Sequence, residues 1–254
     1  MDELQKIIHR NAGKLGKMTY TNADKIRDFA NKVAIESYAE GVNEMSKPLL
    51  SNSNCIANII YTAEEAIKAR KILRTGDIIK VPDFTVPEYD AGTMHFDELK
   101  VLGACLEIVN VNNERAIAMF DHVIFNSAID KDDSVANIYH SQLFEYLNGP
   151  FLQAMKNAGF KNLKEKDIGL ISRYEMFGDG PSFSMFDKEP LHFEYFNNGR
   201  NRIRFDGDED CSRWYWLANQ NEEASRFAGV DNNGRAGWSG ASNRYGISPA
   251  LRIA

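Results

Sequence analysis

The sequence predicts an α+β protein, in which a helical N-terminal part precedes a domain of short strands and few helices. Apolar residues recur at helical spacing before about residue 73. From residue 76 onward, short apolar runs between turn residues indicate strands. From residue 169 onward the periodicity weakens, and this part holds ten of the 18 glycines and all three tryptophans. We expect buried aromatic side chains and turns, rather than long helices, to order it.

Residues 1–50 are predicted to form a helical N-terminal arm. Residues 21–24 offer N-cap chemistry, and Ile26, Phe29, Val33 and Tyr38 then follow at helical spacing. Pro48 ends the segment. Two interpretations stay open, a helix packed on its own domain and an arm that docks on a partner or self-associates. Residues 51–75 are expected to connect this arm to the main domain through a second helix, from about Ala63 to Leu73.

The main domain is expected to span residues 76–254. One helix is predicted from Ser134 to Leu147, with residues 154–160 as an extension, and hairpin turns are predicted at residues 112–114 and 232–234. The residue before the last apolar run, Pro249, suits an edge or a bulge. The expected strands are Asp77–Val81, Val101–Val111, Ala116–Phe125, Ile168–Ser172, Trp214–Leu217, Phe227–Val230 and Ile247–Ile253.

Composition and charge exclude several classes of protein. With 30 basic and 36 acidic residues, the net charge of −6 disfavours generic binding to duplex DNA or to an anionic membrane. Three cysteines cannot form a fully paired disulfide framework. No signal peptide or window of 18 apolar residues is visible, so we expect synthesis in the cytoplasm without a membrane span. Such a protein can still reach the exterior as part of a particle.

Motifs of catalysis are incomplete in this chain. Gly178-Asp179-Gly180 begins like a dinucleotide fingerprint, but Phe183 takes the place of the third glycine. Residues 237–241 resemble a nucleophile elbow that ends in alanine instead of glycine. No two histidines stand at the spacing of metal ligands, and only His192, Glu194 and one acidic turn offer polar groups for an enzyme. We therefore expect no enzymatic activity and no organic cofactor.

The acidic turn at residues 206–210 is the best metal candidate. Asp206, Asp208 and Asp210 alternate around a glycine, and such oxygen ligands suit Ca²⁺. The EF-hand pattern is incomplete because no glutamate stands at its twelfth position. The turn is therefore either a weak calcium site or a solvated acidic loop.

The most specific sequence motifs lie near the C-terminal end. They are Trp214-Tyr215-Trp216-Leu217-Ala218, then Val230-Asp231-Asn232-Asn233-Gly234, then Gly246-Ile247-Ser248-Pro249-Ala250-Leu251-Arg252-Ile253. With the opening strand at Gly76-Asp77-Ile78-Ile79 and the helix from Ser141 to Phe151, these blocks resemble the DUF6273 family over residues 74–254. The resemblance implies a C-type-lectin-like fold related to the formylglycine-generating-enzyme type. The calcium signatures of sugar-binding animal lectins and the paired cysteines of the oxidising enzymes are absent.

The resemblance also implies a role. Members of this family are similar to phage and prophage proteins, and some relatives are variable proteins of diversity-generating retroelements. The implied function is a virion protein that binds a host-surface protein or glycan, and the alternative is a purely structural tail, baseplate or capsid component. Residues 1–50 would contact other virion proteins, and a homo-oligomer is expected.

The expected contact residues are polar and aromatic side chains near the C-terminus, which are also common in ordinary turns. They are Tyr215, Asn219, Asn221, Ser225, Arg226, Asn232, Asn233, Trp238, Ser239, Asn243 and Tyr245.

Overall fold

A computed structural model describes residues 60–68, 73–112, 115–133, 135, 137–206, 208–221 and 226–253. It confirms an α+β architecture with many short strands and few helices. The predicted arm at residues 1–50 lies outside the described residues. Within the described part, no helix has the length and apolar character needed to cross a membrane.

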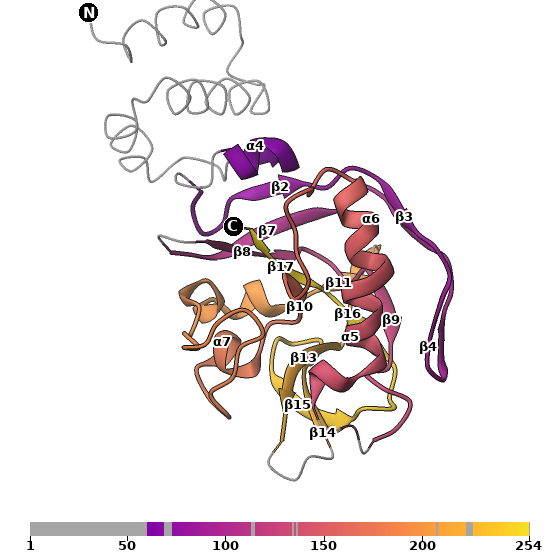
Figure 1. Ribbon diagram of the computed structural model, residues 1–254. Coiled ribbons are helices and arrows are strands. Elements are labelled where there is room, and N and C mark those ends of the chain that lie inside the picture. Colours follow the sequence, from indigo (N-terminus) through magenta and orange to yellow (C-terminus); the bar gives the residue numbers. More distant parts are fainter. Residues whose placement is uncertain are drawn as a thin grey trace, which may run out of the picture.

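A six-stranded sheet forms the upper part of the molecule in Figure 1. The C-terminal strand β17 lies between β8 and β10, so the end of the chain returns to the sheet built from its early strands. All five residues of β8 are buried, which places β8 at the centre of the core. In spatial order the strands are β1 (Ile60–Thr62), β2 (Ile78–Lys80), β7 (Cys105–Val111), β8 (Ala116–Phe120), β17 (Ala250–Ile253) and β10 (Ile168–Gly169).

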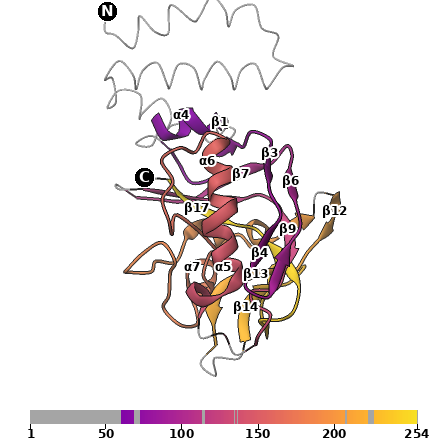
Figure 2. The same ribbon diagram turned by 45° about the vertical axis from the view of Figure 1, so that its right-hand side comes forward.

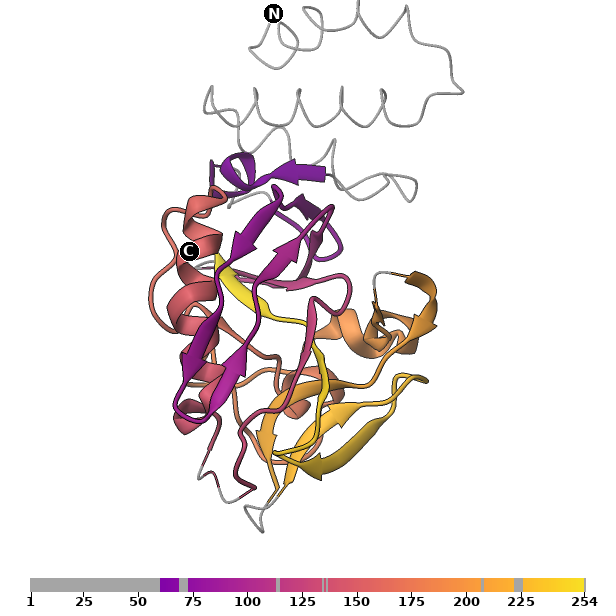
Figure 3. The ribbon, with the colours of Figure 1, turned by 90° about the vertical axis from the view of Figure 1, so that its right-hand side faces the viewer.

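A five-stranded sheet forms the lower part of the same view. The strands β13, β14 and β15 are antiparallel neighbours, whereas β16 pairs in parallel with β13 and antiparallel with β9. The gold strands β13, β14 and β15 lie together at the lower right of Figure 3. In spatial order the strands are β15 (Ala236–Gly240), β14 (Arg226–Val230), β13 (Tyr215–Gln220), β16 (Tyr245–Ile247) and β9 (Phe125–Ser127).

A long two-stranded ribbon occupies residues 84–101, where the sequence analysis placed no strand before Val101. Its pairs are β3 with β6 and β4 with β5, and β4 contacts helix α5. Figure 2 shows the ribbon running beside the helices. Strands of three residues each give too short a periodic signal to be predicted from sequence. The ribbon comprises β3 (Phe84–Val86), β4 (Tyr89–Ala91), β5 (Met94–Phe96) and β6 (Leu99–Val101).

The main helix begins later than the sequence analysis predicted. Ser141 caps it by accepting a hydrogen bond from the amide of Phe144, so the helix begins at Gln142 rather than at Ser134. Pro150 lies within a π-helical turn that absorbs its missing donor and lets the helix continue. The consecutive segments are η2 (Ile138–His140), α5 (Gln142–Tyr146), η3 (Leu147–Phe151) and α6 (Leu152–Asn157). The connecting helix α4 spans Ala63–Lys68, and Leu73 lies outside any helix.

The predicted closing strand from Ile247 to Ile253 is two strands. Ser248 and Pro249 separate β16 in the lower sheet from β17 in the upper sheet. The hydroxyl of Ser248 donates to the carbonyl of Phe120, and the carbonyl of Pro249 accepts from the amide of Phe120. This crossover joins the two sheets at β8, so Pro249 lies at neither an edge nor a bulge.

An irregular segment connects the helices to the lower sheet. Its regular pieces are short, and side-chain hydrogen bonds to the backbone hold most of the remainder. These pieces are α7 (Arg173–Phe177), η4 (Glu194–Asn197), η5 (Gly199–Arg202), β11 (Phe205–Asp206) and β12 (Asp208–Ser212).

Candidate recognition surface

Two of the predicted contact residues are buried and cannot form an exposed surface. Tyr215 is 0% exposed, and its hydroxyl donates to the carbonyl of Arg202 at 2.5 Å. Asn219 is 2% exposed, and its side-chain amide donates to the carbonyl of Pro181 while its oxygen accepts from the amide of Arg173. Both residues hold the irregular segment against β13, and we correct their assignment to a structural role.

The other predicted residues divide between two ends of the β14–β15 hairpin. Asn232 and Asn233 are exposed in the turn that joins the two strands. Arg226 begins β14 and pairs with Gly240 at the other end. A strand of five residues separates these ends by about 13 Å. The predicted surface is therefore not one continuous patch, and Ser225 lies outside the described residues.

The joining turn is held close to η5. The carboxylate of Asp231 accepts hydrogen bonds from the amides of Asn233 and Arg235, each at 2.8 Å. Gly234 has a φ of 76°, and a Cβ there would lie 2.8 Å from the carbonyl oxygen of Gly199. The turn therefore requires glycine for two reasons, its conformation and the close approach of η5.

The far end of the hairpin carries a small polar cluster. The side-chain amide of Asn243 donates to the hydroxyl of Ser239 at 2.9 Å, and that hydroxyl lies 3.2 Å from the hydroxyl of Tyr245. The Tyr245 ring contacts Trp214 and Trp216, with ring centroids 5.5 and 4.9 Å apart. These contacts order the polar cluster while leaving Asn243 exposed. Asn221 directly follows β13, and its side-chain oxygen accepts a hydrogen bond from the amide of Arg226 at the start of β14.

Trp238 is half-buried in the middle of β15, the edge strand of the lower sheet. The guanidinium of Arg173 lies 5.1 Å from the centroid of its ring, and Asp179 holds that guanidinium through two hydrogen bonds of 2.7 and 3.0 Å. Trp238 faces the opposite side of the strand from Ser239, because successive side chains alternate. Arg173 was missing from the predicted surface, since no sequence signal links α7 to β15.

The acidic turn remains an untested calcium candidate. The carboxylate of Asp206 accepts from Arg213 at 2.9 Å. The side chains of Asp208 and Asp210 lie outside the described residues. Among the residues that are described, no three carboxylate, histidine or cysteine side chains gather as a metal site would require.

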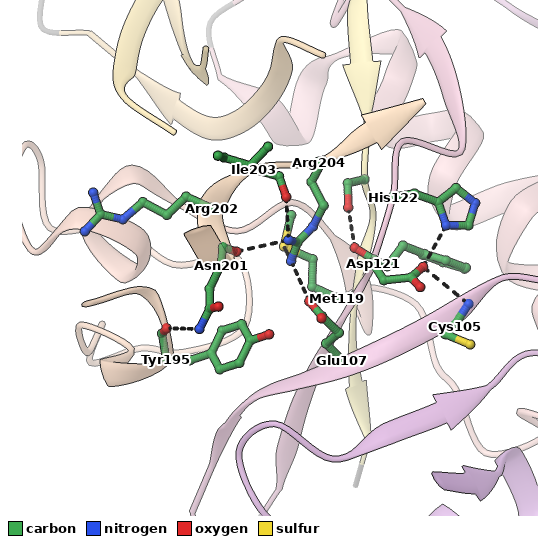
Figure 4. A network of polar contacts seen from close by, with 12 residues as sticks. Cys105, Glu107, Met119, Asp121, His122, Tyr195, Asn201, Arg202, Ile203 and Arg204 are labelled. Carbon is green, nitrogen blue, oxygen red and sulfur yellow. Dashed lines mark hydrogen bonds and ion pairs between the residues drawn. The ribbon is translucent and has the colours of Figure 1, made fainter. Parts of the chain in front are cut away.

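One cluster brings a cysteine, a histidine and an aspartate together. Asp121 accepts from the amide of Cys105 at 3.4 Å, and its carboxylate lies 2.7 Å from the ring of His122 (Figure 4). In this view the thiol of Cys105 points away from His122. Burial, and next the charge of Asp121, raise the pKa of the thiol. This arrangement disfavours the thiolate that a nucleophile needs. The enzyme candidate His192 makes no described contact with Glu194, which is exposed.

A second group in Figure 4 surrounds Arg204, which is 2% exposed. Its guanidinium donates to Glu107 on β7 at 3.1 Å and to the carbonyls of Asn201 and Ile203. The side-chain amide of Asn201 donates in turn to the carbonyl of Tyr195 at 2.8 Å. These bonds tie the irregular segment to the upper sheet, so the group is structural.

Glu175 is a buried carboxyl group that the sequence analysis missed. It is 0% exposed, its carboxylate accepts from the amide of Ser172 at 2.7 Å, and it also accepts from the hydroxyl of Ser184. Burial raises the pKa of Glu175 despite these hydrogen bonds. The spacing of Ser172 and Glu175 is that of a capping box, so the sequence did contain the signal for the start of α7.

No family model, no curated protein and no solved structure matches this chain. The functional argument therefore comes from the chain's own residues.

Proposed function

We propose that this chain is a non-enzymatic recognition module of a phage or prophage virion, which binds a host-surface protein or glycan. The contact surface in this proposal is β15 with Trp238 and Arg173, extended by the exposed side chains of Arg226 and Asn243. The proposal includes a C-type-lectin-like fold and synthesis in the cytoplasm, as the DUF6273 resemblance implies.

The strand order is compatible with that fold type. The C-terminal strand β17 returns to the sheet of the early strands, and a separate antiparallel ribbon of β13, β14 and β15 follows a long irregular segment. This order supports a scaffold in which the C-terminal strand closes the first sheet and the second sheet carries the proposed contact surface. Fold likeness alone does not give a function, so the surface must carry that part of the argument.

The observation that carries the proposal is the environment of Trp238. A partly buried tryptophan with an arginine over its ring combines a rigid apolar surface with a cation, and such residues are enriched in binding hot spots. Ser239 and Asn243 lie on the other side of β15, at the end of the hairpin, and supply adaptable polar contacts at the border of this surface.

Binding of the labelled full chain to intact bacterial cells tests this proposal. We expect Trp238→Ala to weaken binding at least about tenfold, a loss of about 1.4 kcal/mol, while the far-UV circular dichroism stays unchanged. Phe205→Ala is the matched control, because Phe205 is an aromatic residue that is 40% exposed on a different sheet. Equal binding by Trp238→Ala and the parent chain would contradict the proposal. If Trp238→Ala unfolds, Arg226→Glu provides the same test at an exposed position.

A structural virion role is the second candidate, and the composition of β15 favours it. This edge strand has no charged residue, no proline and no bulge within it, although these are the features that usually protect an edge from pairing. A strand from a neighbouring subunit could therefore pair with β15. Under this role, deletion of residues 1–50 should abolish incorporation into particles without unfolding the domain, and continued incorporation would contradict the predicted arm.

A further inference from the structure

A groove of about 500 Å³ lies between the long ribbon and the lower sheet. Strands β5 and β6 with their connection form one wall, and β9 with the turn before β16 forms the other. Helix α5 contributes Tyr146. The volume falls within the range of small-molecule sites, about 300–1,000 Å³.

Aromatic rings line part of this groove. Phe96 and Tyr146 stack with centroids 4.1 Å apart and planes 6° apart. Phe125 meets Tyr146 edge-on at 5.5 Å. Tyr146 is 1% exposed, and among the described residues its hydroxyl has no hydrogen-bond partner. This hydroxyl borders the groove rather than being sealed from it, so a ligand in the groove that bonds to it gains affinity.

The charges of the groove are unevenly paired. Its two carboxylates have basic neighbours, because Asp97 lies 3.4 Å from the ring of His95 and Glu98 lies 3.5 Å from the ammonium of Lys100. On the opposite wall, Lys131 and Arg244 form no ion pair with any carboxylate in the described part of the chain. Arg244 instead donates to the carbonyl of Asn126 at 3.0 Å, which positions its guanidinium. This wall therefore presents two cations that lie outside ion-pairing distance of any described carboxylate, and the nearby carboxylate of Asp133 is bonded to the amide of Ser242 at 2.7 Å.

We propose that the groove binds a small organic anion, a carboxylate attached to a flat apolar ring. The carboxylate is held by Arg244 and Lys131 through charge-assisted hydrogen bonds. The ring packs against Phe125, and a polar substituent on the ring bonds to the hydroxyl of Tyr146. This site is independent of the recognition surface proposed above, and either proposal can fail without the other.

Titration of the full chain with 4-hydroxybenzoate, followed by calorimetry and by NMR of the protein, tests the site. The uncharged analogue 4-hydroxybenzyl alcohol has the same ring and phenol without the carboxylate. We expect saturable binding of the acid and at least about tenfold weaker binding of the alcohol, because only the acid engages the two cations. Inorganic phosphate at equal concentration should not displace the acid, since phosphate has no ring.

Three variants place the ligand in the groove. Arg244→Gln should weaken binding of the acid about tenfold and leave binding of the alcohol unchanged, whereas Arg235→Gln, at an exposed arginine outside the groove, is the matched control and should change neither. Tyr146→Phe should weaken both ligands several-fold without lowering the melting temperature, because its hydroxyl bonds to no described residue. The proposal is overturned by no saturable binding of the acid at about 10 mM, by equal affinity for acid and alcohol, by displacement with phosphate, or by an unchanged affinity in Arg244→Gln.

Discussion

The upper sheet with its helix and the irregular segment of residues 178–204 are stabilised in different ways. In the upper sheet, β8 is wholly buried, and the Phe151 ring contacts four other aromatic rings. In the irregular segment, individual hydrogen bonds such as those of Arg204 and Asn201 hold the chain. The first region depends on apolar area, which tolerates exchange of similar residues, and the second depends on particular atoms.

The largest effect is expected at the centre of the aromatic core. Phe151 is 0% exposed, and it packs against Phe84, Phe120, Phe125 and Tyr146. Phe151→Ala should lower the free energy of unfolding by about 3–5 kcal/mol, through lost burial and a cavity. Urea unfolding measures this change. A loss below about 1 kcal/mol would show that the ring cluster contributes little to the core.

The tie between the two regions should have the next largest effect. Glu107→Ala removes the carboxylate that pairs with the buried guanidinium of Arg204 at 3.1 Å. We expect a loss of about 2 kcal/mol, because Arg204 would keep its charge without this partner. Proteolysis should then cleave first within residues 194–204. Cleavage that begins elsewhere would contradict the role of this contact in holding the irregular segment.

The close packing of β16, the strand before the crossover between the sheets, can be tested at Gly246. A Cβ on Gly246 would lie 2.6 Å from a methyl group of Val123 and 2.9 Å from the carbonyl oxygen of Trp214. Gly246→Ala should therefore destabilise the protein by about 1–3 kcal/mol. Gly199→Ala is the matched control, since nothing lies within 4 Å of a Cβ there. Thermal unfolding compares the two, and equal melting temperatures would contradict the close packing of β16.

The buried carboxyl group of Glu175 predicts a pH dependence. Burial raises its pKa in the folded protein, so the folded state holds the proton more tightly than the unfolded state does. Its contribution to stability is present below the ordinary pKa of glutamate and is lost as the pH rises through the raised pKa. Relative to the parent chain, Glu175→Gln should therefore gain stability as the pH rises. The measurement is the urea midpoint of both proteins at about pH 4 and about pH 8. The same difference between variant and parent chain at both pH values would contradict this prediction.

The smallest effect is expected at the surface of β11. Asp206 and Arg213 form an ion pair of 2.9 Å in which both side chains are partly exposed. Asp206→Asn should change the free energy of unfolding by no more than about 0.5 kcal/mol, and added salt should reduce even this difference. If millimolar Ca²⁺ raises the melting temperature of the parent chain but not of Asp206→Asn, the acidic turn is a calcium site after all.

The two regions also differ in how far the sequence predicts them. Apolar runs located β2, β7, β8, β13 and β14, and the expected turn at Asn232–Gly234 is present. The ribbon of residues 84–101 was missed because its strands have three residues each. Tyr215 and Asn219 were assigned to the surface because β13, on which both lie, is buried on both faces and therefore leaves no alternating signal. The contact of Arg173 with Trp238 and the groove beside Tyr146 depend on long-range packing, which residue spacing does not encode.

Site-specific photo-crosslinking tests the central claim, recognition through the exposed end of the lower sheet, most directly. A photoreactive amino acid would replace Asn243 in one sample and Phe205 in another. Both residues are exposed, but Asn243 lies in the turn between β15 and β16 of the lower sheet, whereas Phe205 lies on β11. Each labelled chain would be irradiated on intact host cells. The proposal predicts a crosslinked host component from position 243 and none from position 205. Crosslinking from position 205 alone would place the contact surface elsewhere and contradict the proposal.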